Sequence, residues 1–170
     1  MSLGVLIGAA AILDALWPVF LLLGWKRVRI EPGNTAFTPL AFDSYPISHS
    51  LLATLEWSVL GGSLYWPIPR DGRDAEIVAL LVVSHWMLDA LSHRPDLPLT
   101  LTGSARVGLG LWNSVPATFV VEAAMFAVGG WLYATFTRAQ DRVGRRVFAA
   151  FVGVLALLYR ANVFGPPPPV

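Results

Sequence analysis

The chain has 170 residues, of which 55% are hydrophobic and 14% are charged, and its formal net charge is +1. A soluble domain carries about 25% charged residues, so the composition places this chain in the membrane class. The nearly balanced charge gives no indication of a nucleic-acid partner. Because the chain has no cysteine, disulfides and thiolate metal ligands are excluded.

Five apolar runs approach the roughly 20 residues that a helix needs to cross a bilayer. They cover residues 3–25, 47–66, 75–92, 115–136 and 147–164. The last run reaches this length only if Arg160 snorkels to the interface. We therefore predict an all-α fold, an integral membrane bundle of five helices, or four if the last run does not cross, forming a single domain over residues 1–170. The first run lacks a basic start and contains Asp14, so we expect it to be retained rather than cleaved as a signal peptide.

Two connections between these runs are long, residues 26–46 and 93–114. Long loops without regular structure of their own are often functional. Two glycine pairs, Gly61–Gly62 and Gly129–Gly130, predict close contacts between helices.

Polar side chains interrupt the apolar runs. The acids inside four of the predicted spans are Asp14, Glu56, Asp89 and Glu122. The histidines near them are His49, His85 and His93. No lysine or arginine lies in the interior of these spans, and a buried carboxylate costs several kcal/mol unless it is protonated or paired. The acids therefore need another source of positive charge, and a bound cation is the simplest one.

The spacing of these residues indicates a common site. His85, Asp89 and His93 recur every four residues and share a helix face, and His49 and Glu56 are two turns apart. At about 1.5 Å per residue, the polar residues of four helices fall in the same half of the membrane. The two long loops on that side contribute Asp43 and Asp96. Carboxylate and imidazole ligands without sulfur favour zinc, with manganese or iron as alternatives, and their number suffices for one or two ions.

Two segments carry a resemblance to a known family. They are Tyr45-Pro-Ile-Ser-His49-Ser50 and the run His-x3-Asp-x3-His-x-Pro-Asp from His85 to Asp96. Over residues 40–100 the chain resembles the bacterial membrane-bound metal-dependent hydrolases, inner-membrane proteins with a proposed distant similarity to zinc-dependent phospholipase C and related zinc nucleases. The resemblance implies a core metal site of Asp43, His49, His85 and Asp89.

The candidate residues fall into three groups. The predicted metal ligands are Asp43, His49, His85, Asp89, His93 and Asp14. The catalytic candidates are Glu56, Glu122 and Asp96, where Glu56 or Glu122 would complete a second metal position or act as general base. Arg94 and Arg106 are candidate contacts to an anionic substrate, with lipid phosphates as their alternative partners.

Each assignment has a structural alternative. His85 and Asp89 could form a simple hydrogen bond between helix turns, and His49 could cap a helix at the bilayer surface. Asp14 could remain protonated and bond to a neighbouring helix. These alternatives explain single residues and leave the convergence of several acids unexplained.

The leading functional hypothesis is a metal-dependent hydrolase that acts on a phosphoester, or another ester, of a membrane lipid or lipid-linked substrate at the bilayer surface. The alternative is a cation or proton transporter, because intramembrane acids and histidines also build relays. A transport path needs polar groups leading to both faces, whereas the opposite half of the predicted bundle is apolar except for small hydroxyl residues such as Ser58 and Ser63. A purely structural membrane protein ranks third.

Overall fold

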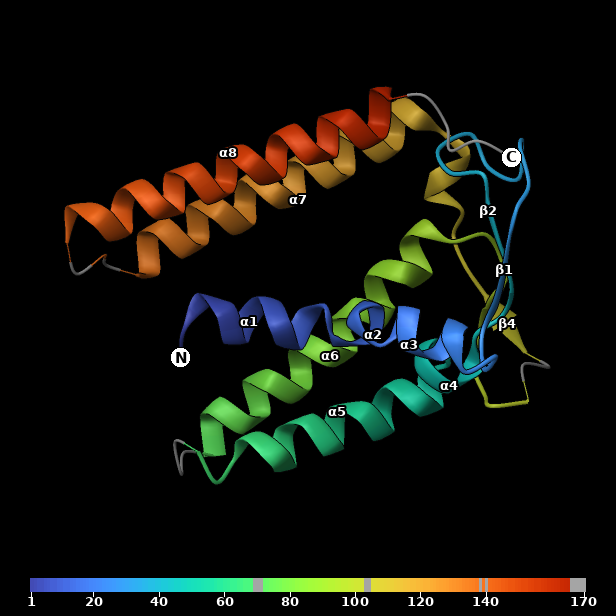
Figure 1. The fold of residues 1–170 in the computed structure, drawn as a ribbon, viewed down its shortest axis with the longest axis horizontal. Helices are drawn as coiled ribbons and strands as arrows, with labels where there is room; N and C mark the ends of the chain where they lie inside the picture. The colour runs from blue at the N-terminus through green and yellow to red at the C-terminus, as the bar shows by residue number, and fades with distance from the viewer. Residues whose placement is uncertain (69–71, 103–104, 138, 140, 166–170) are drawn as a thin grey trace.

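The computed structural model describes residues 1–68, 72–102, 105–137, 139 and 141–165, and this part of the chain is mostly helical (Figure 1). The helices are α1 (Leu3–Ala10), α2 (Ile12–Ala15), α3 (Trp17–Leu22), α4 (Pro46–His49), α5 (Leu51–Tyr65), α6 (Gly72–Ser92), α7 (Val115–Phe136) and α8 (Arg142–Phe164), with a short 3-10 helix, η1 (Leu111–Asn113). The strands are β1 (Arg27–Ile30), β2 (Leu40–Ser44), β3 (Leu97–Pro98) and β4 (Arg106–Val107).

Three helices, α6, α7 and α8, are long and apolar enough to cross a membrane. The bent pair formed by α1 and the segment Ile12–Leu22 makes a fourth if it is counted as one span. The run predicted at residues 47–66 is divided, because Ser50 has an extended backbone and caps α5 by accepting a hydrogen bond from the Ala53 N–H. This leaves α5 with 15 residues, fewer than the roughly 20 needed to span. By contrast, α8 begins at Arg142 rather than at Val147 and has 23 residues.

The first apolar run is a broken helix. The axes of α1 and of the segment Ile12–Leu22 differ by 68°, and Ala11 between them has a non-helical backbone with φ −100° and ψ 5°. Pro18 in the first turn of α3 has no N–H to extend the hydrogen-bond ladder backwards. As a result Asp14 lies just after the bend at Ala11, in the middle of an apolar segment.

Both long loops form β-hairpins, which the all-α prediction did not include. β1 pairs with β2 in antiparallel register, with a bulge between Arg27 and Val28, and β3 pairs with β4. The hairpins lie together at one end of the molecule (Figure 1). Pairing satisfies the backbone N–H and C=O groups that a long structureless loop would leave without partners.

Helices α5 and α6 pack closely against each other. A Cβ atom on Gly62 of α5 would lie 3.0 Å from the Ala75 carbonyl oxygen of α6, and the Ser58 hydroxyl donates to the Ala79 carbonyl at 3.0 Å. The predicted contact at Gly62 is therefore confirmed. The corresponding prediction for Gly129 and Gly130 is wrong, since an added Cβ would meet nothing within 4 Å.

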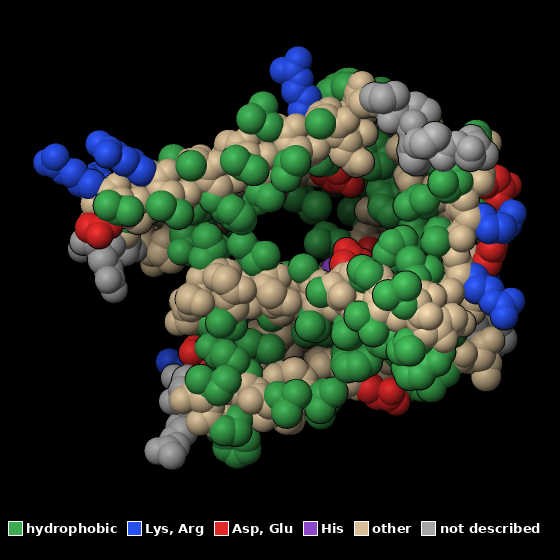
Figure 2. All heavy atoms as spheres, viewed as in Figure 1, with side chains coloured by type: hydrophobic (Ala, Val, Ile, Leu, Met, Phe, Trp, Pro, Cys, Tyr) green, Lys and Arg blue, Asp and Glu red, His purple; other side chains and the backbone are tan. Residues whose placement is uncertain are grey.

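The antiparallel helices α7 and α8 form a hairpin that is separated from α1 by an open space (Figures 1 and 2). Large apolar side chains on this hairpin point outward, with exposed fractions of 64% for Val120, 64% for Trp131 and 68% for Leu157. Soluble proteins rarely expose apolar surface over such an area, and it is typical of helices that contact lipid.

The loop after β4 closes over the end of α6. The Leu109 N–H donates to the Ala90 carbonyl at 2.8 Å, and the Gly110 N–H donates to the His93 carbonyl at 2.7 Å. These bonds satisfy carbonyl groups that a helix end leaves free. Gly108 has φ +155°, and a Cβ there would lie 1.9 Å from the Arg94 carbonyl oxygen.

We expect Gly108→Ala to lower the free energy of unfolding by about 2 kcal/mol or more, because backbone strain and overpacking each cost about 1–3 kcal/mol. Unfolding in a mixed-micelle denaturant series measures this loss. Gly33→Ala is the matched control, since Gly33 also has a positive φ of +87° but meets nothing within 4 Å. Equal losses in the two variants would show that the contact with Arg94 is not tight.

Candidate metal centre

Four side chains from three helices converge at one point: Asp14 of α2, His49 of α4, and His85 and Asp89 of α6. The Nε2 atom of His49 lies 3.3 Å from Asp14 Oδ1 and 3.7 Å from Asp89 Oδ2. The Nε2 atom of His85 lies 3.7 Å from Asp14 Oδ1 and 3.4 Å from Asp89 Oδ2. Each imidazole therefore faces both carboxylates, and we call these residues the Asp/His quartet.

Backbone features hold the quartet in place. His49 is the last residue of α4, and its carbonyl accepts a hydrogen bond of 3.0 Å from the Trp86 indole of α6. His85 and Asp89 are one turn apart on α6, so their side chains lie on the same face. Asp14 lies just after the 68° bend between α1 and the segment Ile12–Leu22.

The hydrogen bond of His85 defines which ring nitrogen is free. Its Nδ1 lies 2.9 Å from the Ala10 carbonyl oxygen, which can only accept, so Nδ1 carries the hydrogen. In neutral imidazole the other nitrogen, Nε2, then carries a lone pair. A backbone carbonyl that fixes the tautomer in this way is the common outer partner of a metal-binding histidine.

That lone pair points at a second acceptor. His85 Nε2 and Asp89 Oδ2 are both buried and neither has a hydrogen-bond partner among the described residues. Two unpartnered acceptors 3.4 Å apart repel each other, and each retains a desolvation cost of about 1–3 kcal/mol. A cation between them would satisfy both atoms.

The spacing within the quartet fits a small divalent ion. Two ligand atoms bound about 2.0–2.1 Å from a tetrahedral zinc ion lie roughly 3.3–3.4 Å apart, and the nitrogen–oxygen separations of Asp14 from His49 and His85 are 3.3 and 3.7 Å. Asp14, His49 and His85 each offer a ligand atom within 4.8 Å of the others, and Asp89 lies beside this group without belonging to it. Two carboxylates and two neutral imidazoles would also balance the charge of one divalent ion.

Lys26 lies next to His49 of the quartet. From the sequence we expected no basic side chain near the buried acids, so this part of the prediction is wrong. The Lys26 side chain is 3% exposed, and its Nζ lies 3.3 Å from His49 Nδ1. The Ser48 hydroxyl lies 2.7 Å from the same nitrogen. Burial lowers the pKa of Lys26 to about 8, against the opposing influence of Asp14 and Asp89. Because Lys26 lies just beyond the first apolar run, hydropathy alone gave no signal for it.

The charge of Lys26 determines what His49 can bind. A protonated ammonium group only donates, so His49 Nδ1 must accept and Nε2 must carry the hydrogen. With a neutral Lys26, Nδ1 can donate to Ser48 and Nε2 can offer a lone pair. Lys26 is therefore an internal cation that would compete with a metal ion for the quartet.

The quartet is open on one side. The side chains of His49, His85 and Asp89 are 7%, 13% and 17% exposed, whereas that of Asp14 is 65% exposed. Figure 2 shows acidic side chains on both sides of the space between α1 and the α7/α8 hairpin, with a histidine beside one of them. A ligand would thus approach the quartet past Asp14.

His93 belongs to a second cluster rather than to the quartet. Its Nδ1 lies 3.1 Å from Asp96 Oδ1, and the Tyr45 hydroxyl donates to the same oxygen at 3.3 Å. The His93 ring packs against Trp112, with ring centres 4.5 Å apart. Burial and the neighbouring Asp96 raise the pKa of Tyr45 above its ordinary value, so this phenol remains protonated.

Asp43 is held away from the quartet by a surface ion pair. The Arg29 guanidinium donates to its two carboxylate oxygens at 2.6 and 2.9 Å. These hydrogen bonds lower the pKa of Asp43. The residue that the resemblance placed in the core set thus pairs across the β1–β2 hairpin, whereas Asp14, also a predicted ligand, lies beside His49 and His85.

The other predicted residues also lie outside the quartet. Glu56 is on an exposed face of α5, and Glu122 lines a cavity between α7 and α8. Arg94 donates to the Asn34 carbonyl at 3.3 Å and approaches Asp96 at 3.8 Å. Arg106 of β4 lines a small surface cavity with Asp43 and Asp96.

No protein-family model, curated protein or solved structure matches this chain. The resemblance to the hydrolase family therefore stays a prediction from the two sequence segments.

Proposed function

We propose that this chain is an integral membrane protein whose Asp/His quartet holds a divalent metal ion, with zinc favoured, and that it hydrolyses an ester. The observation that carries the metal assignment is the pair of buried, unpartnered acceptors, His85 Nε2 and Asp89 Oδ2. The exposed apolar faces of α7 and α8 support membrane insertion, and the family resemblance suggests the bacterial inner membrane.

A divalent ion in the quartet would lower the pKa of a bound water molecule and polarise an ester oxygen. The chain contributes the orientation of the ligands. The Ala10 carbonyl fixes His85 and Ser48 contacts His49, while the exposed side of Asp14 leaves room for a substrate.

Two features support a lipid or lipid-linked phosphoester as the substrate. The approach to Asp14 runs between helices whose outer faces are apolar, so a molecule dissolved in the bilayer can enter from the side (Figure 2). The resemblance, through its proposed kinship with zinc-dependent phospholipase C, favours a phosphoester.

The test is hydrolysis of phospholipids and model phosphoesters by protein in lipid nanodiscs, before and after removal of metal by a chelator. We expect activity to be lost on chelation and restored by zinc or manganese. His85→Ala and Asp89→Ala should lower kcat/KM by about a hundredfold or more, since loss of an outer partner alone costs about 10- to 100-fold. Glu56→Gln is the matched control, because this acid is exposed and outside the quartet. Unchanged turnover in His85→Ala would refute the catalytic assignment.

A cation transporter is the second candidate, and the 68° break beside Asp14 is the feature that favours it. Interrupted helices inside membranes often build ion sites. Metal-dependent cation flux in proteoliposomes, without ester hydrolysis, would favour this function over the hydrolase.

A further inference from the structure

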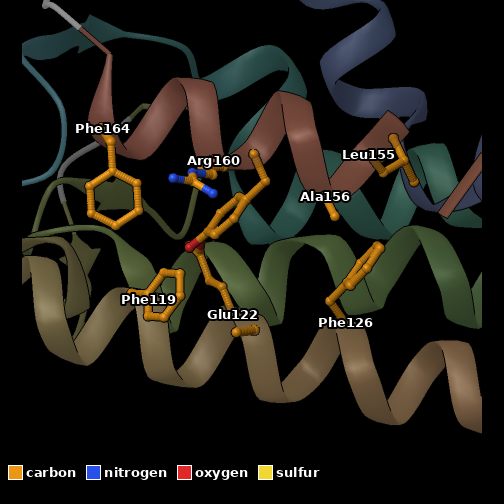
Figure 3. A pocket seen from close by; sticks show the side chains of 9 residues that line it. Phe119, Glu122, Phe126, Leu155, Ala156, Arg160 and Phe164 are labelled. Atoms are coloured by element: carbon orange, nitrogen blue, oxygen red, sulfur yellow. The ribbon is translucent and has the colours of Figure 1, made fainter. Parts of the chain in front are cut away.

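A cavity of about 880 Å³ lies between α7 and α8. Its walls are mostly apolar and include Phe119 and Phe126 of α7 and Leu155 and Phe164 of α8. Figure 3 shows these side chains projecting from the two helices into the space between them. We call it the α7/α8 cavity, and it contains no member of the Asp/His quartet.

Three polar side chains interrupt the apolar wall: Glu122, Tyr159 and Arg160. The Tyr159 hydroxyl is buried and makes no hydrogen bond of ordinary geometry among the described residues, although Glu122 is close enough to interact with it electrostatically. Arg160 forms no ion pair with any described acid, including Glu122 on the facing wall. The cavity therefore offers a ligand one cation that has no ion-pair partner among the described residues, with the Tyr159 hydroxyl and the Glu122 carboxyl interacting beside it.

The polar groups lie toward one end of the hairpin. Arg160 is one turn from the end of α8 at Phe164. The same end of α8 lies near the β1–β2 hairpin, because Ala161 and Val163 line a cavity together with residues Ile30 and Leu40. A cation near the end of an apolar helix lies at the depth of the lipid headgroups, so the ligand would be polar at that end and apolar along the rest of its length.

We propose that the α7/α8 cavity binds one membrane phospholipid, with its phosphate at Arg160 and Tyr159 and an acyl chain between Phe126 and Leu155. An arginine forms charge-assisted, often bidentate hydrogen bonds to phosphate, and the tyrosine hydroxyl supplies a further donor. This site requires membrane insertion but does not depend on the hydrolase activity, because the bound lipid contacts no residue of the quartet.

Native mass spectrometry of detergent-solubilised protein, titrated with phosphatidylglycerol, tests the proposal. We expect Arg160→Gln to weaken binding at least tenfold. Arg146→Gln, which removes an exposed arginine at the opposite end of the same helix, should leave binding unchanged. Diacylglycerol, which has the same chains without the phosphate, should bind the wild-type protein at least tenfold more weakly. Equal binding by Arg160→Gln and wild type, or by the two lipids, would overturn the proposal.

A second substitution tests the apolar part of the cavity with the charge intact. Ala156→Trp places a large ring in the wall of the cavity and should also reduce phosphatidylglycerol binding at least tenfold, whereas Ala150→Trp, on an exposed stretch of α8 outside the cavity, should not. Metal content, measured on the same samples, reports on the quartet separately. Loss of metal with normal lipid binding would contradict the proposed function alone, and normal lipid binding in Ala156→Trp would contradict the lipid site alone.

Discussion

Asp14→Asn is expected to lower the affinity for zinc by about a hundredfold or more, whereas Asp43→Asn should leave it within about threefold of the wild-type value. The carboxylate of Asp14 faces both imidazoles at 3.3 and 3.7 Å, and an amide of the same size removes its charge. Loss of an outer hydrogen-bond partner alone costs about 10- to 100-fold in affinity, so loss of a ligand should cost at least that. Competition with a chromophoric chelator measures the constant.

The two variants distinguish the Asp/His quartet, which is the ligand set proposed from the structure, from the ligand set implied by the family resemblance. Asp43 is bound by Arg29 on the surface, and exposed ion pairs contribute about 0–1 kcal/mol to stability, so its asparagine variant should fold normally. A large loss of affinity in Asp43→Asn, with none in Asp14→Asn, would mean that the functional site differs from the quartet.

Lys26→Met should raise the affinity for zinc at least tenfold, which corresponds to about 1.4 kcal/mol. The Lys26 ammonium lies 3.3 Å from His49 Nδ1, where it repels a bound cation and holds the hydrogen of His49 on the nitrogen that faces the ion. Two unit charges about 6 Å apart repel by roughly 3 kcal/mol at an effective dielectric constant of 20. Methionine keeps the apolar stem and removes the charge.

The pH dependence gives an independent check on Lys26. Because burial lowers its pKa to about 8 from 10.5, the ammonium loses its proton as the pH rises through about 8. The advantage of Lys26→Met over wild type should therefore be largest at pH 7 and should shrink toward pH 9. Arg27→Met removes a neighbouring exposed charge and should reproduce neither effect. A pH-independent difference between Lys26→Met and wild type would show that the effect comes from packing.

The sequence predicted the members of the quartet better than its surroundings. His85 and Asp89 were placed on one helix face from their spacing alone, and that spacing holds because α6 runs unbroken from Gly72 to Ser92. The same rule failed for His93, which lies just beyond the last helical residue and turns toward Asp96. Helical spacing relates two side chains only while the helix continues between them.

Glu56 shows the same limit in a second helix. It is seven residues from His49, which would be two turns in a continuous helix, but the extended backbone of Ser50 separates α4 from α5. His49 consequently faces the quartet, whereas Glu56 is exposed. A hydrophobic run of suitable length does not reveal such a break, because Ser50 is compatible with either a helix interior or a cap.

The positions of Lys26 and Asp43 could not be predicted from the sequence near them. Both lie in the connection that contains the β1–β2 hairpin. The pairing register of the two strands brings Arg29 close enough to form an ion pair with Asp43. Lys26 lies just before this hairpin and folds inward beneath His49. Neither outcome follows from local composition, since each depends on contacts between segments distant in the sequence.

The break after Ala10 affects two members of the quartet, because it places Asp14 and leaves the Ala10 carbonyl free to accept a hydrogen bond from His85. In an uninterrupted helix the Asp14 amide would donate to the Ala10 carbonyl, but among the described residues that oxygen instead accepts from His85. Straightening the N-terminal helix would withdraw a carboxylate and release an imidazole in one movement. If the quartet holds the proposed ion, its occupancy and the bent shape of this helix would therefore stabilise each other.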